Sequence, residues 1–361
     1  MHSNPIRVLV VDDSLVMRSL LRMVLASEPA IELAGMAADG ASALEAMERI
    51  KPDLILLDIE MPCMNGLEVL AELRARRSTA KVIMCSTLTR RGAGITLDAL
   101  AGGASDYVTK PTAQHGAADA VDTLSRDLLP KIKALFATSL HADASVVVSG
   151  APAQESMQVK EAKVVVIGVS TGGPAALEVL LPQLPENFPV PVAIVQHMPQ
   201  LFTSLLAERL NRECALKVAE ASQGVRMEAG TVYIARGDWH LELARMAFGG
   251  SYGLRLTQAM PEHFCRPSVD VLFRSAAEKY GNGVIGVVLT GMGSDGFDGC
   301  KAIRSAGGRV LVQDRATSAV WGMPGAVAEA GLAHRVLPLK AIAAELVRLC
   351  PVNSSALAAK R

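Results

Sequence analysis

The sequence predicts two α/β domains, each built on a parallel sheet with helices on both faces. The chain has 361 residues, more than a single hydrophobic core usually organises. Short apolar runs alternate with amphipathic helical patterns, which is typical of parallel sheets. A polar stretch rich in alanine and serine, residues 138–162, interrupts this alternation and separates its two halves.

The first half of the chain contains five apolar strands, each followed by a helix. We expect the strands at Arg7–Val11, Ile31–Ala37, Leu54–Leu57, Val82–Cys85 and Tyr107–Thr109. The helices are expected from Ser14, at Ala41–Arg49, Leu67–Arg76 and Ile95–Leu100, and from Val121 to Phe136. Parallel strands joined by helices give a five-stranded sheet. The pattern predicts a first domain at 1–125 and a linker at 126–161 that is partly helical at its start.

The second half repeats the strand and helix alternation, with extra strands in its middle. Strands are expected at Val164–Ile167, Val192–Val195, Val218–Ala219, Thr231–Ile234, His240–Leu243, Leu254–Thr257, Gly283–Leu289 and Arg309–Val312. Helices are expected at Pro174–Leu181, Phe202–Leu210, Val269–Tyr280, Gly299–Ala306 and Pro324–Ala330. We predict a second doubly wound α/β domain at 162–350 with some antiparallel strands, and a tail at 351–361.

Composition excludes several classes of protein. The 36 basic and 36 acidic residues balance, so the net charge does not favour binding to nucleic acid or to an anionic membrane surface. The six cysteines are scattered without a Cys-x-x-Cys pair, so we expect reduced thiols in a cytosolic protein. Because the amino end lacks a secretory signal and no apolar stretch reaches about 20 residues, we expect a cytoplasmic chain without membrane insertion.

Polar side chains gather at the carboxyl ends of the strands in the first domain. Asp12 and Asp13 follow the first strand, Asp58 ends the third, Ser86 ends the fourth and Lys110 ends the fifth. These strand ends converge on one crevice in a parallel sheet. Crowded carboxylates there suit Mg²⁺, with Asp12, Asp13 and Asp58 as its ligands. We interpret Asp58 as a phosphate acceptor and expect Ser86 and Lys110 to sense the phosphate.

The second domain also has polar residues after its predicted strands, and their types suit nucleophilic catalysis. Ser170 lies in a Gly-x-Ser-x-Gly turn between a buried strand and a helix, a geometry that exposes the hydroxyl. His197 follows the strand Val192–Val195, and Asp295 lies in a glycine-rich turn after Gly283–Leu289. A serine nucleophile needs a base and an acid that orients it.

Two questions about this set stay open from spacing alone. His240 is a rival for the base, because periodicity does not separate it from His197. The glycine-rich turn could instead hold a nucleotide phosphate, but it lacks the full Gly-x-Gly-x-x-Gly spacing and the Gly-Lys-Ser/Thr ending. If the turn is catalytic, the amide of Thr171 and the turn Gly291–Gly293 are the expected oxyanion donors.

The first domain resembles the response-regulator receiver family. The resemblance is carried by VLVVDDS, LLDIEMPCMNGLEVL and DYVTKP. It implies a flavodoxin-like domain that a chemotaxis histidine kinase phosphorylates with Mg²⁺ at Asp58. It also implies that the surface near Ser86 and Tyr107 rearranges after phosphorylation.

The second domain resembles the chemotaxis protein-glutamate methylesterase family, CheB. The resemblance is carried by IGVSTGGPAALEVLLPQLP, VQHMPQLFTSLLAERL, CRPSVDVLF, VLTGMGSDG and QDRATSAVWGMPGAV. It implies Ser170 as nucleophile, His197 as base and Asp295 as its partner, with the amide of Met292 in the oxyanion hole. The implied substrates are γ-glutamyl methyl esters, and for some members glutamines, on the cytoplasmic domains of methyl-accepting chemoreceptors. No cofactor is expected in this domain.

One chain with a switch and an esterase suggests that the receiver covers the esterase cleft until Asp58 is phosphorylated. Three other functions compete with this interpretation. The second domain could be a binding module with little turnover, or an esterase or amidase for another substrate. A transcriptional regulator is disfavoured because no basic helix-turn-helix follows the receiver.

Overall fold

The computed structural model describes residues 4–111, 116–137, 161–246 and 252–351. The chain forms two compact units, Met1–Phe136 and Ala137–Arg361, which are described separately. Most of the predicted linker (138–160) and most of the predicted tail (352–361) lie outside the described residues. In the part of the chain that the structure describes, no helix combines the length and apolarity needed to cross a membrane.

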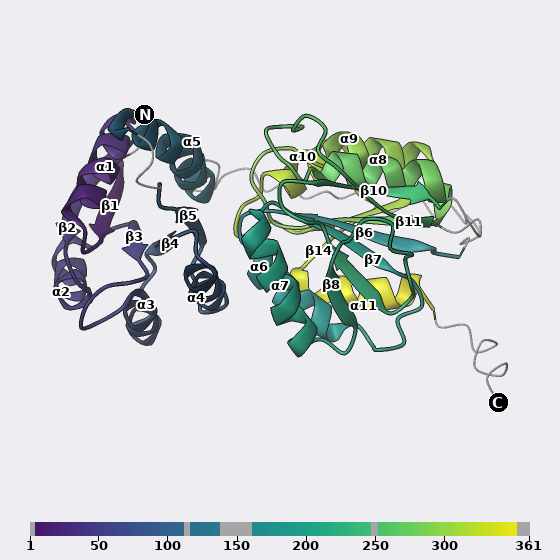
Figure 1. The fold of residues 1–361 in the computed structure, drawn as a ribbon, viewed down its shortest axis with the longest axis horizontal. Helices are drawn as coiled ribbons and strands as arrows, with labels where there is room; N and C mark the ends of the chain where they lie inside the picture. Colours follow the sequence, from purple (N-terminus) through teal and green to yellow (C-terminus); the bar gives the residue numbers. More distant parts are fainter. Residues whose placement is uncertain (1–3, 112–115, 138–160, 247–251, 352–361) are drawn as a thin grey trace. The chain divides into compact units, whose positions relative to one another are not determined.

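The first unit is a five-stranded parallel sheet in the order β2-β1-β3-β4-β5. Figure 1 shows α1 and α5 on one face of the sheet and α2, α3 and α4 on the other. The predicted sheet is confirmed. Its strands are β1 (Ile6–Val11), β2 (Ile31–Ala37), β3 (Leu54–Asp58), β4 (Lys81–Ser86) and β5 (Asp106–Thr109), and its helices are α1 (Leu15–Ala26), α2 (Gly40–Ile50), α3 (Gly66–Ala75), α4 (Arg90–Ala101) and α5 (Ala117–Phe136).

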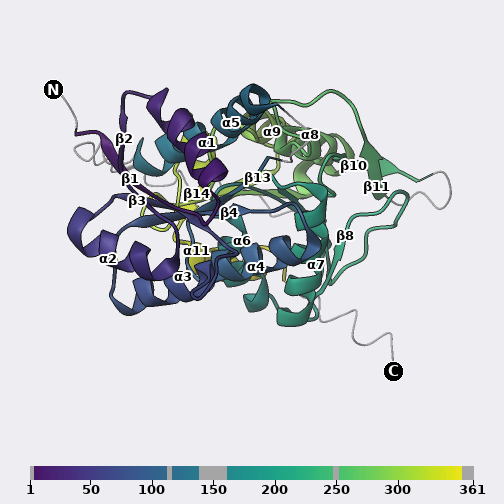
Figure 2. The same ribbon diagram turned by 60° about the vertical axis from the view of Figure 1, so that its left-hand side comes forward.

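The second unit is built on a seven-stranded sheet in the order β14-β13-β12-β6-β7-β9-β8, and all of its neighbouring strands are parallel. The strands are β6 (Val164–Val169), β7 (Val192–Gln196), β8 (Lys217–Glu220), β9 (Thr231–Ile234), β12 (Val284–Val288), β13 (Arg309–Gln313) and β14 (Arg335–Leu337). A separate antiparallel hairpin joins β10 (His240–Arg245) to β11 (Tyr252–Thr257) and lies beside α8 (Figure 2).

Helices cover both faces of the second sheet, as predicted (Figure 1). One face carries α6 (Gly173–Leu180), α7 (Gln200–Glu213) and α11 (Leu339–Leu349), and the other carries α8 (Val269–Tyr280), α9 (Phe297–Ser305) and α10 (Met323–Glu329). Two 3₁₀ turns, η2 (Leu181–Gln183) and η3 (Gly281–Gly283), complete the described elements. Neither β14 nor α11 was predicted from the sequence. Among the described strands, β10 and β11 form the antiparallel pair, and isolated antiparallel bridges join Arg226 to Gly253 and Glu262 to Cys265.

The central strands of the second sheet do not alternate between apolar and polar residues. Every residue of β6, β7 and β12 is buried, because helices cover both faces. Burying each valine or isoleucine there contributes roughly 1.5–3 kcal/mol. These three strands are neighbours in the order β12-β6-β7, so the loops at their carboxyl ends meet.

Helix α8 packs so closely on β6 that only glycine fits at position 168. A Cβ at Gly168 would lie 2.3 Å from Cγ1 of Val269, the first residue of α8. We expect Gly168→Ala to lower the free energy of unfolding of the second unit by about 1–3 kcal/mol, because overpacking forces the backbone to shift. Urea unfolding followed by tryptophan fluorescence measures this, since Trp239 and Trp321 both lie in that unit.

The matched control is Gly94→Ala in α4, where a Cβ meets no atom within 4 Å. This change should stabilise the first unit by roughly 0.5–1 kcal/mol through helix propensity, measured by circular dichroism. Equal stability of Gly168→Ala and the wild-type protein would show that α8 does not press on β6 as described.

Candidate functional site

The candidate esterase residues lie at neighbouring strand ends in the second unit. In the parallel pair β6–β7, Val169 is the partner of Gln196, so Ser170 and His197 each follow directly. The His197 amide donates to the Val169 carbonyl at 3.2 Å, and the Ser170 amide donates to the Thr290 carbonyl at 3.0 Å. The backbone therefore joins the ends of β7, β6 and β12 into one rim.

Ser170 stands in the strand–turn–helix geometry that the sequence predicts. It follows β6, and α6 begins three residues later at Gly173. Gly172 has φ +75°, in the left-handed region that glycine adopts without strain, and this allows the sharp turn. The side-chain amide of Gln196 donates to the carbonyl oxygens of both Ser170 (3.1 Å) and His197 (3.3 Å), which fixes the two strand ends together.

Asp295 is buried and accepts four hydrogen bonds. Its Oδ1 accepts from the Ser268 hydroxyl (2.8 Å) and the Asp270 amide (2.9 Å). Its Oδ2 accepts from the Val269 amide (2.7 Å) and lies 2.8 Å from His197 Nε2. The amides belong to the first turn of α8, where the helix dipole favours a negative charge. Burial by itself raises the pKa of Asp295, but His197 and these amides outweigh it and hold the pKa below its ordinary value.

His197 uses its two ring nitrogens differently. Nε2 faces the Asp295 carboxylate, and Nδ1 lies 3.7 Å from Sγ of Cys265. Burial lowers the pKa of His197, but the contacts with Asp295 and Cys265 more than compensate and raise it above the ordinary value of 6.5. Because the carboxylate accepts from Nε2–H, Nδ1 is the nitrogen that is left to accept a proton.

The structure does not join all three predicted triad residues by hydrogen bonds. His197 and Asp295 are in contact, but the Ser170 hydroxyl makes no hydrogen bond to the imidazole among the described residues. Catalytic hydrogen bonds are often long in the absence of substrate and tighten when substrate binds, and Ser170 already occupies the adjacent strand end. The structure thus shows a His197–Asp295 pair at the strand end next to that of the candidate nucleophile.

The turn after β12 lies against Ser170. A Cβ at Gly291 would lie 2.9 Å from the Ser170 Cβ, so the backbone approaches the serine closely. Within the described residues the Met292 amide donates to no acceptor, which leaves it available for an oxyanion. The Thr290 hydroxyl donates to the Thr171 carbonyl at 2.9 Å, so it ties both candidate oxyanion segments together.

The rival base, His240, has both ring nitrogens engaged by backbone. Its Nδ1 accepts from the Ser268 amide at 3.2 Å, and its Nε2 lies 3.1 Å from the Met260 carbonyl. The side chain is 1% exposed. This geometry holds the segment before α8 in place and leaves no nitrogen to accept a proton from Ser170, so it favours His197 as the base.

Four residues with a clear place at this site were not singled out from the sequence. Gln196 joins the ends of β6 and β7, and Thr290 joins the end of β12 to Thr171. Ser268 donates to Asp295, and Cys265 faces Nδ1 of His197. Gln196 and Thr290 directly follow apolar strand residues, which is a signal that could have identified them. The other two belong to a loop far along the chain, and no spacing rule places them there.

The candidate phosphorylation site lies in the first unit. The ammonium group of Lys110 lies 2.7 Å from Asp12 Oδ2 and 2.7 Å from Asp58 Oδ1. Carboxylate oxygens of Asp12, Asp13 and Asp58 lie within 4.8 Å of one another. An all-oxygen donor set of this kind fits Mg²⁺. The predicted residues of this crevice are therefore brought together at one edge of the sheet.

Burial dominates the electrostatics of Asp58. It raises the pKa of Asp58 to about 6, with a further contribution from Asp12, although Lys110 acts in the opposite direction. Burial also acts to lower the pKa of Lys110, but its two carboxylate partners raise it above the ordinary value. The Lys110 ammonium thus lies between two carboxylates in the crevice.

Two of the three residues predicted to sense the phosphate, Ser86 and Tyr107, lie on the adjacent strands β4 and β5, and the third, Lys110, contacts Asp58. The Ser86 hydroxyl is buried and accepts from the Thr96 hydroxyl of α4 at 2.6 Å. Tyr107 is 7% exposed, and the Lys131 ammonium lies 5.0 Å from its ring centroid. Ser86 therefore connects the crevice to α4, whereas Tyr107 is packed inward in this state.

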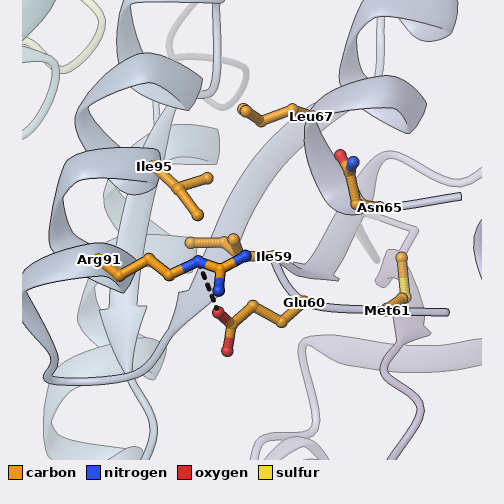
Figure 3. Close-up of a pocket in the computed structure, with 7 residues that line it drawn as sticks. All are labelled: Ile59, Glu60, Met61, Asn65, Leu67, Arg91 and Ile95. Carbon is orange, nitrogen blue, oxygen red and sulfur yellow. Dashed lines mark ion pairs between the residues drawn. The ribbon is translucent and has the colours of Figure 1, made fainter.

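A cleft lies beside Asp58, between the start of α3 and α4. Its volume is about 420 Å³. Figure 3 shows Arg91 of α4 reaching toward Glu60, with Nε and Oε1 3.8 Å apart. The other lining residues are Ile59, Met61, Asn65, Leu67 and Ile95. Two of its lining residues, Ile59 and Glu60, directly follow Asp58 in the chain.

Comparison with known proteins identifies both units. Residues 165–346 match the family model described as CheB methylesterase, and residues 8–122 match the response regulator receiver domain model. Two curated relatives share the description protein-glutamate methylesterase/protein-glutamine glutaminase. The one from Nocardioides sp. is 49% identical and covers 95% of each chain, and the one from Trichodesmium erythraeum is 45% identical over 95% of this chain and 98% of the relative.

A solved structure supports the same assignment. The crystal structure of the Thermotoga maritima CheB methylesterase catalytic domain matches with a TM-score of 0.51 and 44% identity, covering 53% of this chain and all of that domain. The two family models match the two units of the chain, and the relatives match nearly its whole length. The chain therefore belongs to the CheB family of protein-glutamate methylesterase/protein-glutamine glutaminases.

Proposed function

We propose that the chain is a phosphorylation-controlled serine hydrolase that demethylates glutamate methyl esters on chemoreceptors and also deamidates receptor glutamines. The observation that carries the proposal is the pairing of His197 with the buried Asp295 at the strand end next to that of Ser170. The names of the full-length relatives support the substrate class. We place this reaction in the cytoplasm, where a receptor's cytoplasmic helices are accessible.

The first half of the reaction forms an acyl-enzyme. Nδ1 of His197 takes the hydroxyl proton of Ser170 while the serine oxygen attacks the side-chain ester carbonyl of the substrate. The tetrahedral intermediate collapses, the bond to the methoxy group breaks, and His197 returns the proton to methanol. A receptor glutamine follows the same course and releases ammonia.

The second half of the reaction regenerates the enzyme. Water gives a proton to Nδ1 of His197 and attacks the acyl carbon, and Ser170 leaves with that proton. Asp295 stays ionised because four donors satisfy its carboxylate, so it holds the imidazole as the Nε2–H tautomer in both halves. The Met292 amide, together with the amide of Thr171, is the proposed donor to the oxyanion.

The receiver unit supplies the control. Asp12, Asp13 and Asp58 would hold Mg²⁺, which when bound neutralises the charge that builds up on the transferred phosphoryl group. Asp58 attacks the phosphorus atom of a phosphohistidine on a chemotaxis kinase, and the kinase histidine leaves. Lys110 then binds a phosphate oxygen, and Ser86 moves toward the phosphate. We propose that the unphosphorylated receiver restrains the esterase and that phosphorylation releases it.

Loss of the nucleophile tests the chemistry. Ser170→Ala should lower methanol release from methylated receptor by about 10⁴-fold or more, because removal of a nucleophile leaves only binding and oxyanion stabilisation. The matched control is Ser294→Ala, an exposed serine next to Asp295 whose hydroxyl makes no described hydrogen bond. A serine-reactive phosphonate should add its mass to Ser170 in the control but not in Ser170→Ala. Labelling elsewhere would overturn the assignment.

The ion pair sets the pH at which the base works. His197 accepts a proton only when neutral, and Asp295 raises its pKa, so its titration midpoint should lie above 6.5. In Asp295→Asn the negative charge is gone, and the midpoint should move to lower pH. The titration is measured by NMR of the imidazole carbon protons, with His197→Gln identifying the signal.

Asp298→Asn is the control for that titration, because its carboxylate is exposed and pairs with Lys301 rather than with His197. It should leave the midpoint of His197 unchanged. A midpoint that moves equally in both aspartate variants, or upward in Asp295→Asn, would refute the role given to Asp295.

Removing the phosphate acceptor tests the switch. A small phosphodonor with Mg²⁺ should raise esterase activity of the wild-type chain roughly 5- to 150-fold, the usual range of allosteric coupling. Asp58→Asn should show no increase, whereas Glu45→Gln, an exposed acid of α2, should respond normally. Deleting residues 1–140 should give activity at least as high as that of the phosphorylated wild type. A truncated protein no faster than the unphosphorylated chain would reject restraint by the receiver.

A further inference from the structure

The proposed mechanism leaves one reactive group at the site unused, namely the thiol of Cys265. Sγ lies 3.7 Å from His197 Nδ1. Glu262 holds the turn that carries this thiol. It exchanges backbone hydrogen bonds of 2.7 and 3.2 Å with Cys265, and its carboxylate pairs with Arg274 of α8 at 2.6 Å. The thiol therefore stands at a fixed position beside the nitrogen that must accept the proton of Ser170.

The separation of these two atoms matches a chelate. Zinc binds cysteine sulfur at about 2.3 Å and histidine nitrogen at about 2.0–2.1 Å, and at a tetrahedral angle the two ligand atoms are about 3.6 Å apart. The observed distance between Sγ and Nδ1 is 3.7 Å. The pair needs no rearrangement of the turn to take such an ion.

The far side of the imidazole is also arranged as in zinc sites. A histidine that binds a metal through one nitrogen usually donates its other N–H to a carboxylate, which fixes the ring and strengthens the bond to the metal. His197 does this through Nε2, 2.8 Å from Asp295. Because both Asp295 oxygens already accept two hydrogen bonds each, Asp295 is an outer partner and not a direct ligand.

We propose that His197 Nδ1 and the Cys265 thiolate form an inhibitory site for Zn²⁺, with water completing the coordination and Asp295 orienting the imidazole. On binding, the thiol gives its proton to solvent, and the metal takes the lone pair of Nδ1. That lone pair is the one that accepts the proton of Ser170, so the two uses exclude each other. Inhibition rests on the proposed esterase mechanism, whereas binding of the metal does not.

The chemistry of the ligands separates this site from the other metal-ligand clusters. Asp12, Asp13 and Asp58 offer only oxygen and suit Mg²⁺, which binds thiolates poorly. His263, Asp270 and Asp295 also lie together but include no thiol. Among the described residues, the pair Cys265–His197 alone joins a thiol to an imidazole in such a cluster.

The experiment uses the full chain and Co²⁺ as a spectroscopic substitute for Zn²⁺. Co²⁺ should give a thiolate-to-cobalt charge-transfer absorption in the near ultraviolet, and Zn²⁺ should displace it at one equivalent. Cys265→Ser should lack this absorption, while Cys63→Ser, an exposed cysteine of the receiver, should retain it. The substitution Asp58→Asn in all samples removes a ligand of the carboxylate site. Cobalt binding without the absorption, or with it in Cys265→Ser, would overturn the proposal.

A second readout links the site to activity. Zn²⁺ should inhibit methanol release by the wild-type chain in the presence of excess Mg²⁺, and a chelator should restore it. Loss of an outer partner alone weakens metal binding about 10–100-fold, so Cys265→Ser should need at least tenfold more Zn²⁺ for half-inhibition, relative to its own metal-free rate. Equal inhibition of both proteins would contradict the site.

The two readouts also separate the two proposals. If the metal-free chain releases no methanol but still shows the cobalt–thiolate absorption, the proposed esterase function fails and the metal site stands. If methanol is released and the absorption is missing, the esterase function stands and the metal site fails.

Discussion

The buried carboxylate of Asp295 is the interaction on which the second unit's site depends. An unpaired charge in an interior is costly, and the chain avoids this cost by directing four donors at one side chain. Those donors come from the loop before α8, the first turn of α8 and the end of β7. The charge therefore fixes three segments that are distant in sequence, and the imidazole is oriented as part of the same network.

The two units place an aspartate in similar burial with opposite results. Asp58 and Asp295 are 3% and 2% exposed, but the pKa of Asp58 is raised and that of Asp295 is lowered. Asp58 shares Lys110 with a second carboxylate, so burial dominates. Asp295 receives backbone amides at a helix start as well as an imidazole. The difference fits the proposed roles, in which Asp58 exchanges its partners on phosphorylation and Asp295 keeps its partners throughout the reaction.

The sequence predicted the parts of the fold that periodicity and strand ends determine. Both parallel sheets and the position of Ser170 before α6 were predictable, because glycine-rich turns follow fully apolar runs. The short β14 was not, since three residues carry no period, two of them exposed. The contacts of Ser268 and Cys265 were not predictable either, because they depend on how the loop before α8 crosses the sheet edge. The spacing of residues in the sequence predicts which strand ends lie together, but it does not predict the orientation of the His197 imidazole.

The orientation of His197 links the proposed esterase mechanism to the proposed metal site. With Nε2 committed to Asp295, the whole basicity of the ring is expressed at Nδ1, and that single lone pair faces a thiol on one side while Ser170 occupies the neighbouring strand end. In the proposed mechanism, the carboxylate that makes Nδ1 a stronger base for Ser170 would also make it a stronger ligand for a metal. The two proposals therefore share one physical cause, the His197–Asp295 pair. With Cys265 beside Nδ1, a change that strengthens the proposed base should also strengthen the proposed metal site.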